Sequence, residues 1–204
     1  MMKTCKVCGK ECDKLIKGMC IKHYTQLKNH GKIKRTRYDP NEIVEYEDYA
    51  EVVLYNKQCE EIARALIDLE DINKVKQYKW SLKDNGYVLC KSKKIRLHRL
   101  IMDCPDNMVV DHINHNPLDN RKDNLRICTQ HQNSMNRCKL SNNSSGVTGV
   151  YWNKRSNKWA STITHNDRRI FLGSFNTKEE AIRARKNAEI EYFGEYRNDS
   201  EDVN

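Results

Sequence analysis

Short stretches in which hydrophobic and polar residues alternate make up most of the C-terminal quarter of the chain. The alternation occurs three times, with polar turns at 154–158 and 165–168, which predicts three antiparallel strands. Thr177 followed by Glu180 is a capping-box pattern, and the alanines after it recur on one helical stripe as far as Gly194. This region is therefore predicted to be a three-stranded sheet backed by one helix.

Residues 108–137 show a different order of apolar and polar positions. A short apolar run ends in Asp111 and His112, a polar loop follows, and Leu125 begins a second apolar run. Thr129 opens another capping-box pattern, which places the start of a helix directly after the second run. The predicted order is strand, polar loop, strand and helix. Further upstream, residues 87–100 predict a β-hairpin around a basic turn.

Composition favours several small modules over one large core. The chain has 204 residues, of which 38% are hydrophobic, and its mean hydropathy is −0.90. No apolar run approaches the roughly 18 residues of a membrane span, and the first residues lack the apolar segment of a secretory signal. We therefore expect a cytoplasmic protein that is neither secreted nor bound to a membrane.

The net charge of +9 is unevenly distributed. Residues 1–40 are strongly basic, residues 41–75 are mostly acidic, and basic residues return between 137 and 169. Two basic regions around an acidic spacer indicate a polyanion that is held at two places, with the spacer kept away from it. Charge alone leaves open the alternative of a generally soluble basic protein.

The cysteine spacing points to a metal. Nine cysteines without a secretory signal argue against a disulfide framework. Cys5 with Cys8, and Cys20 with His23, are two short pairs that can each present two soft ligands from one turn. Four such ligands make a closed tetrahedral Zn²⁺ site. Cys12 is a spare thiol that could replace a member of the first pair.

The residues around Asp111 and His112 are suited to phosphodiester hydrolysis. The Asp111 carboxylate suits a hard divalent cation such as Mg²⁺, and a neutral imidazole such as His112 suits proton abstraction from water. Asn133 falls on the first turn of the predicted helix, where its amide oxygen could complete the cation site. Asn124 is placed to fix the polar loop by hydrogen bonds to its backbone. A plain polar turn is the alternative interpretation.

The stretch "VVDHINHNPLDNRKDNLRICTQHQN" resembles the HNH endonuclease motif, in the form found in phage and intron-encoded homing endonucleases. By position, His112 matches the first His, Asn124 the central Asn, and Asn133 the last position, where the family often has His. Asp111 matches the acidic metal ligand before the first His. The upstream "IRLHRLIM" is similar to the family's lead-in and places His98 close to the site. The resemblance implies a ββα-metal fold with Mg²⁺ or Mn²⁺ and His112 as general base.

Residues 146–188 resemble the ethylene-response-factor (APETALA-type) DNA-binding domain, through "GV", "KW", "LGSF" and "T-EEA" in that order. The resemblance implies that the three-stranded sheet enters the major groove of double-stranded DNA. Threonines at 148, 162 and 164, and Tyr151, stand where the plant domains usually carry charged contacts, so a different DNA sequence is expected. The candidate DNA contacts of the whole chain are Arg35, Arg37, Arg121, Arg126, Tyr151, Trp152, Arg155, Lys158, Arg168 and Arg169.

Three small modules of the α+β class are predicted, joined by two linkers. The modules are a zinc finger-like basic module at 1–38, a ββα-metal nuclease core at 51–140 and a DNA-binding domain at 146–198, with an acidic linker at 39–50 and a polar linker at 141–145.

The predicted function is a site-specific DNA endonuclease of the homing type, held on double-stranded DNA at both ends. One active site per chain suits a monomer that nicks one strand. The alternative of a dimer that cuts both strands is left open. The alternatives are a non-catalytic DNA-binding regulator with a vestigial nuclease core and an RNA-binding zinc protein. The intact set of Asp111, His112 and Asn133 favours the enzyme, because a binding protein would not need it.

Overall fold

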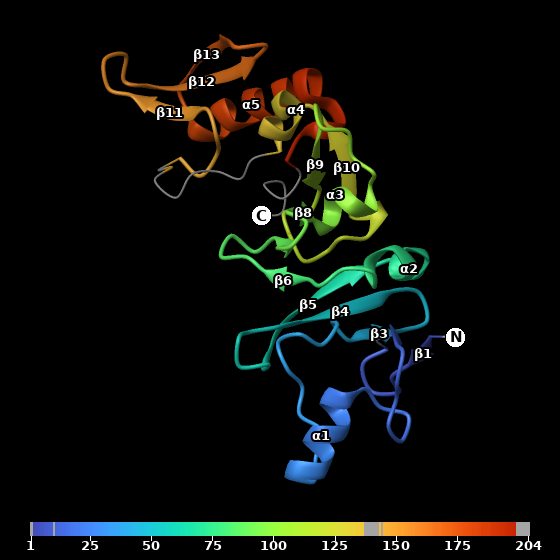
Figure 1. The fold of residues 1–204 in the computed structure, drawn as a ribbon. Coiled ribbons are helices and arrows are strands. Elements are labelled where there is room, and N and C mark those ends of the chain that lie inside the picture. Colours follow the sequence, from blue (N-terminus) through green and yellow to red (C-terminus); the bar gives the residue numbers. More distant parts are fainter. Residues whose placement is uncertain (1, 10, 137–142, 144, 199–204) are drawn as a thin grey trace. The chain divides into compact units, whose positions relative to one another are not determined.

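The computed structural model describes residues 2–198 except 10, 137–142 and 144 (Figure 1). The chain divides into two compact units, the first made of Met1–Ile101 with Pro117–Lys122 and the second of Met102–Asn116 with Asp123–Asn204. Small antiparallel sheets and short helices build both units, which confirms the α+β class. None of the described helices has the length and apolar character needed to cross a bilayer.

The first unit begins with two very short strands and a helix. β1 (Lys3–Thr4) pairs with β2 (Glu11–Cys12), and α1 spans Ile21–His30. Gly31 ends the helix in the left-handed conformation, with φ 66°, and its N–H donates to the Leu27 carbonyl. The buried cluster of this region consists mainly of cysteines, so the region has little apolar core of its own.

Strands β3 (Ile43–Glu45), β4 (Ala50–Tyr55) and β5 (Glu61–Ile67) form an antiparallel sheet with β4 in the centre. β4 is rich in β-branched and apolar residues, most of them buried, which favours a central strand. β3 lies inside the segment 39–50, so the predicted acidic linker contributes a strand to this sheet. The pattern did not predict this strand because only two apolar residues, Ile43 and Val44, stand among acidic neighbours.

A second small sheet contains β6 (Ser81–Leu82), β7 (Val88–Cys90) and β8 (Ile95–Arg96). The predicted hairpin is confirmed for β7 and β8, but its second strand ends at Arg96 and not at residue 100. Helix α3 (Leu97–Ile101) follows instead. Its first and last residues are both buried, and their spacing of four is that of one helix face.

Trp80 anchors the core of the first unit. Its side chain is 2% exposed, and Nε1 donates to the carbonyl of Val75 at 2.9 Å. Val75 is the last residue of α2 (Ile72–Val75), which directly follows the 3₁₀ helix η1 (Leu69–Asp71). Other large apolar side chains of this unit are also almost fully buried, among them Val52, Leu54, Ile67, Val88 and Leu97.

The second unit contains the predicted order of strand, loop, strand and helix. β9 (Val109–His112) pairs antiparallel with β10 (Leu125–Cys128), which directly follows the 3₁₀ turn η2 (Lys122–Asn124). Helix α4 (Gln130–Met135) begins after β10, and Thr129 caps it through the predicted capping box. The sequence prediction is confirmed here at each element, because both the apolar runs and the cap are local features of the chain.

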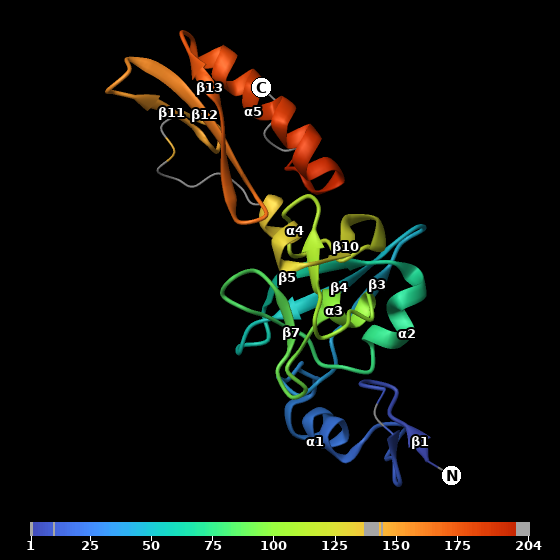
Figure 2. The same ribbon diagram turned by 90° about the horizontal axis from the view of Figure 1, so that it is seen from above.

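The C-terminal part of the second unit is a three-stranded sheet covered by one helix. β11 (Val150–Asn153), β12 (Lys158–His165) and β13 (Arg168–Phe175) are antiparallel, with β12 in the centre. Figure 2 shows α5 (Lys178–Phe193) lying along one face of this sheet. Both predicted turns, the capping box and the helix end are confirmed, and η3 (Gly194–Tyr196) follows. The module boundaries at 38, 50, 140 and 145 stay predictions, and most of the linker lies outside the described residues.

Gly149 occupies a position that no side chain fits. Its φ is +78°, and an added Cβ would lie 2.2 Å from the carbonyl oxygen of Thr162. That carbonyl accepts a hydrogen bond from Arg185 at 2.7 Å, so it cannot move away without breaking this bond.

We therefore expect Gly149→Ala to lower the free energy of unfolding, measured in urea, by about 1–3 kcal/mol more than Gly146→Ala. Gly146 is the matched control because it has φ +86° and no described atom within 4 Å of its added Cβ. Equal unfolding midpoints for the two variants would contradict the steric argument.

Candidate functional site

The adjacent residues Asp111 and His112 end strand β9, and both are buried, with 7% and 5% of their surface exposed. Asp111 lies opposite Arg126 in the ladder, and His112 lies opposite Leu125 in the last pair. Residues directly opposite one another in an antiparallel pair project from the same face of the sheet. Asp111 and Arg126 are therefore placed to contact each other.

Hydrogen bonds fix the Asp111 carboxylate in one orientation. Arg126 donates from Nε at 3.0 Å and from Nη2 at 2.7 Å, and Asn136 donates from Nδ2 at 2.9 Å. The bonds from Arg126 are charge-assisted and are therefore stronger than bonds between neutral groups. All of these donors bond to Oδ2, so among the described residues the other oxygen, Oδ1, is the one left for a cation.

Asn136 joins the end of helix α4 to the end of strand β9. It is the C-cap residue of α4, is 2% exposed, and also donates to the carbonyl oxygen of His112 at 3.2 Å. Sequence reasoning missed this residue. The available signal was its spacing from Asn133, because residues three apart lie on the same face of a helix. That spacing places Asn133 on the face of α4 that carries Asn136.

The donor set of this region fits a hard divalent cation. Mg²⁺ and Mn²⁺ prefer oxygen ligands such as carboxylates and amide oxygens. Asp111 offers a carboxylate of which one oxygen is oriented by three hydrogen bonds, and Asn133 on α4 carries an amide oxygen. Asn133 is half-buried, and its N–H bonds to the Thr129 carbonyl at 3.0 Å within the first turn of α4. Asp111 and Asn133 stay the predicted ligands of such an ion.

Two arginines predicted to contact DNA are engaged in ion pairs. Arg126, besides binding Asp111, donates to the carbonyl of Glu195 and lies with Cζ 4.8 Å from the ring centroid of Tyr196. Arg121 binds the Asp119 carboxylate with Nε and Nη2, each at 2.8 Å. The sequence did not reveal these partners, because the pairing of Arg126 depends on the register of β9 and β10, and that of Arg121 on the geometry of the loop before β10.

Asn124 fixes the polar loop after β9, as its position in the sequence suggested. Its Oδ1 accepts a hydrogen bond from the Asn114 N–H at 3.0 Å, and its carbonyl accepts one from the Ile113 N–H at 2.9 Å. His115 lies in the same loop with φ 61°, and its Nε2 is 3.1 Å from Oδ1 of Asn198. These contacts give Asn124 and His115 structural roles in shaping the loop.

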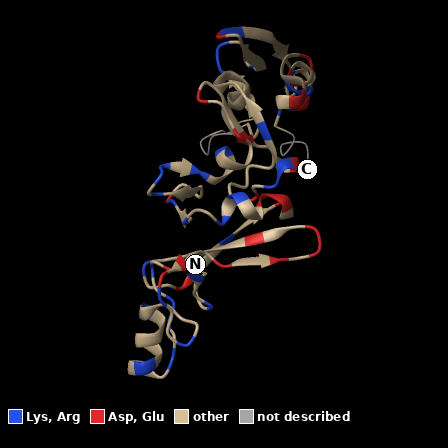
Figure 3. Cartoon of the chain, turned by 45° about the vertical axis from the view of Figure 1, so that its right-hand side comes forward, with Lys and Arg blue, Asp and Glu red and all other residues tan. Residues whose placement is uncertain are grey.

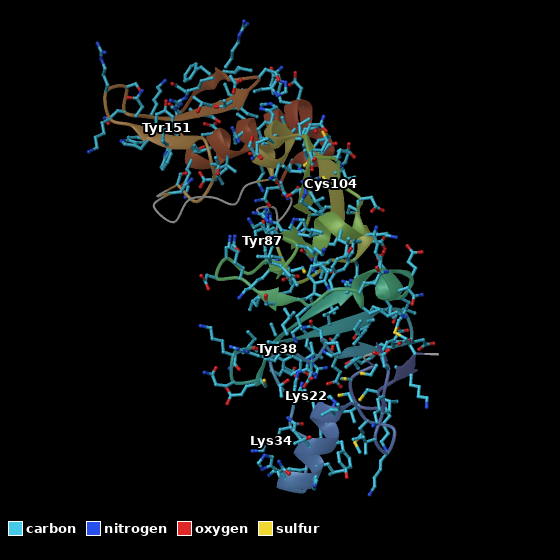
Figure 4. All side chains as sticks on the ribbon, in the orientation of Figure 1. Lys22, Lys34, Tyr38, Tyr87, Cys104 and Tyr151 are labelled. Atoms are coloured by element: carbon cyan, nitrogen blue, oxygen red, sulfur yellow. The ribbon has the colours of Figure 1, made fainter. Side chains whose placement is uncertain are left out.

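His98 belongs to the first unit, on helix α3, and is 2% exposed. Its ring meets the ring of Tyr87, labelled in Figure 4, edge to face with centroids 5.2 Å apart. Aromatic packing of this kind is a structural contribution. The predicted role of His98 near the catalytic residues stays a prediction.

The structure brings together the predicted zinc ligands Cys5, Cys8, Cys20 and His23, whose ligand atoms all lie within 4.8 Å of one another. Nδ1 of His23 is 3.3 Å from Sγ of Cys20 and 3.6 Å from Sγ of Cys5. Burial raises the pKa of Cys5, but hydrogen bonds from the Cys20 N–H and from His23 outweigh it and lower this pKa to about 5. Because the thiolate is the form that binds Zn²⁺, the donor set fits this ion. The spare thiol, Cys12, is not part of the cluster.

Asp39 lies beside the cluster of predicted zinc ligands, and sequence reasoning missed it. Its Oδ1 lies 3.6 Å from Nε2 of His23, and its Oδ2 accepts the Thr36 N–H at 2.6 Å. Burial raises the pKa of Asp39, but the hydrogen bonds from Lys22 and Thr36 lower it below its usual range. A carboxylate behind a ligating histidine fixes the ring orientation of that ligand.

The predicted contacts on the C-terminal sheet are exposed. Tyr151, labelled in Figure 4, and Trp152 are 38% and 43% exposed on β11, and Phe171 on β13 is 61% exposed. Arg169 lies with Cζ 5.6 Å from the Tyr151 ring. Ala160 and Ile163, by contrast, are buried. The other predicted contacts, Arg155, Lys158 and Arg168, are also exposed.

Replacing Asn136 by Ala is expected to lower the free energy of unfolding by about 1–3 kcal/mol, because it removes a buried donor from Asp111 and from the His112 carbonyl. Asn73→Ala, at an exposed position, is the control and should change stability by less than about 0.5 kcal/mol. Urea unfolding of both variants measures the difference. Equal stability of the two variants would mean that the contacts of Asn136 contribute nothing.

Part of the chain is similar to known proteins. Residues 103–135, which include β9, β10 and α4, match the sequence profile of the HNH endonuclease family. The chain is 32% identical over 139 residues to "Uncharacterized HNH endonuclease L560" of Acanthamoeba polyphaga mimivirus, an alignment that covers 65% of this chain and 72% of that protein. It is 38% identical over 60 residues to "Protein 3.8" of Escherichia phage T7, covering 29% of this chain and 50% of that protein. No solved structure matches the chain.

Proposed function

The chain belongs to the HNH endonuclease family, and on this premise we propose that it is a site-specific endonuclease of the homing type that cuts double-stranded DNA. The observation that carries the proposal is the oriented Asp111 carboxylate directly beside His112 at the end of β9. A polar turn without function would not require a buried carboxylate held by a buried amide and a guanidinium.

His112 is proposed as the general base. Its imidazole takes a proton from a water molecule, the water oxygen attacks the phosphorus, and the bond from phosphorus to the leaving sugar oxygen breaks. Asp111 and Asn133 are proposed to hold Mg²⁺ or Mn²⁺, which when bound supplies Lewis-acid stabilisation of the phosphate charge. Arg126 and Asn136 hold Asp111 in place, and Asn124 holds the loop that follows His112.

The two ends of the chain are proposed to position the duplex. The N-terminal cluster is proposed to bind structural Zn²⁺ and so to order the basic segment that contains Arg35 and Arg37. The exposed aromatic and basic side chains of β11–β13 support a DNA-binding role for the C-terminal sheet, similar to that of the ethylene-response-factor domains. Side chains of this kind bind phosphates and base edges.

The test is incubation of the purified full chain with supercoiled plasmids that carry fragments of candidate target genomes, with and without Mg²⁺ or Mn²⁺. We expect conversion to nicked or linear plasmid only with the divalent cation, and only for some fragments. DNA binding without cleavage under every metal condition would instead identify a non-catalytic DNA-binding regulator.

A further inference from the structure

Cations from four separate segments of the first unit line one groove of about 360 Å³. Arg35 and Arg37 follow helix α1, Lys57 lies in the turn between β4 and β5, Lys79 precedes β6, and Lys91 lies in the turn between β7 and β8. No Asp or Glu is among the described residues that line it. We call this surface, defined by these five residues, the basic groove.

Hydrogen bonds and a buried ring fix the segments that carry the cations. Asn41 donates from Nδ2 to the carbonyls of Val53 and Trp80, and its Oδ1 accepts the Trp80 N–H at 2.7 Å. These bonds, with the buried Trp80 side chain, hold Lys79 beside strand β4. The lysines in the two hairpin turns are positioned by the pairing of β4 with β5 and of β7 with β8.

Most acidic residues of the sheet lie away from the basic groove or are engaged. The turn between β3 and β4 contains Glu47 and Asp48, and it lies at the opposite end of β4 from Lys57, about 20 Å along the strand. Figure 3 shows acidic residues in red at that turn. Nearer the groove, Glu61 pairs with Arg64 at 2.7 Å, and Glu60 accepts a hydrogen bond from Asn56.

In the described part of the chain no ion pair joins a carboxylate to a cation of the basic groove, although the charge of Asp39 acts on Lys79. Lys57 and Lys91 are exposed and form no ion pair there, and Arg35 rests on the ring of Tyr55, with Cζ 3.7 Å from its centroid. Lys79 donates to the uncharged carbonyl oxygen of Asp39. Burial and the charge of Arg35 lower the pKa of Lys79. Positive charges gathered in this way raise the free energy of the protein unless an anion binds among them.

We propose that the basic groove binds a stretch of the phosphate backbone of double-stranded DNA, as a contact distinct from the C-terminal sheet. The inference rests on the proposed function, because it assumes the same DNA substrate. Lys and Arg side chains around a groove are the groups that hold phosphates without reading sequence. The proposal replaces the expectation that residues 41–75 stay away from the DNA, since Lys57 belongs to that segment.

The experiment measures binding of the full chain to a fluorescent duplex of arbitrary sequence, about 30 base pairs long, in EDTA at several salt concentrations. Lys57→Ala/Lys91→Ala tests the groove, and Lys76→Ala/Lys83→Ala is the control with the same loss of charge at exposed positions outside it. Circular dichroism checks that both variants are folded. For the groove variant we expect weaker binding and a slope of log K against log salt that is smaller by about 2, with the control close to wild type.

Several results would overturn the proposal. The first is unchanged binding by the groove variant. The second is an equal loss of binding in the groove and control variants, which would reflect net charge alone. The third is displacement of the labelled duplex by single-stranded RNA at a lower concentration than by unlabelled duplex. Because binding is measured without a divalent cation, the result does not depend on catalysis. A chain that binds through the groove and never cleaves DNA would overturn the proposed function and leave this inference standing.

Discussion

His112→Ala is expected to slow DNA cleavage by about 10²–10⁴-fold, the usual contribution of a general base, while leaving DNA affinity unchanged. The substitution removes the imidazole that takes the proton from water. It leaves the backbone of β9 intact, because Asn136 bonds to the carbonyl oxygen of His112 and not to its ring. Single-turnover cleavage of a labelled target duplex with Mg²⁺ measures the rate, and anisotropy in EDTA measures binding.

His115→Asn is the matched control, because His115 is the next histidine along the chain and lies in the loop with φ 61°. Asparagine tolerates this left-handed conformation, so the loop should keep its shape. We expect cleavage within a few-fold of wild type. Normal cleavage by His112→Ala together with loss of cleavage in His115→Asn would contradict this assignment. It would mean that the general base is His115, in the loop, and not His112 at the end of β9.

Cys20→Ala is expected to abolish stoichiometric Zn²⁺ binding and to unfold the N-terminal region. Structural Zn²⁺ contributes about 10–16 kcal/mol to the folding of comparable small modules, and this region has little apolar core besides its cysteines. Removing this predicted ligand also removes the contact of Cys20 Sγ with Nδ1 of His23. Zinc content by atomic emission and limited proteolysis of residues 2–38 measure the two effects.

Cys12→Ala is the control for the zinc prediction, since Cys12 is the nearby thiol outside the cluster. It should keep one Zn²⁺ per chain and the protease resistance of the wild type. Loss of zinc in Cys12→Ala with retention in Cys20→Ala would mean that the metal, where bound, uses a different set of thiols. Loss in both variants would mean that Cys12 also supports the site.

Local sequence features were sufficient to predict the elements of the second unit. The apolar run before Asp111, the capping boxes at Thr129 and Thr177, and the alternation between 150 and 175 each act over a few residues. Paired cysteine and histidine ligands were likewise predictable, because each pair is close in sequence. In these regions the secondary structure depends on residues that are close together in the sequence.

Contacts between distant residues could not be predicted in the same way. Arg126 binds Asp111 across the β9–β10 pair, a contact that follows from strand register, and its predicted contact with DNA stays a prediction. Residues 97–100 were predicted to continue a strand, but Leu97–Ile101 form a helix, in which the buried Leu97 and Ile101 lie on one face. The basic groove depends on four segments that only the fold of the first unit brings together.

Sequencing of the DNA ends produced by the wild-type chain tests the proposed endonuclease most directly. Genomic DNA from candidate hosts is incubated with the protein and Mg²⁺, and breaks on each strand are mapped against parallel reactions with His112→Ala and with EDTA. We predict breaks at one or a few discrete positions that are absent from both controls. Breaks at random positions, or equal breaks with His112→Ala, would contradict a site-specific enzyme that uses His112 as its base.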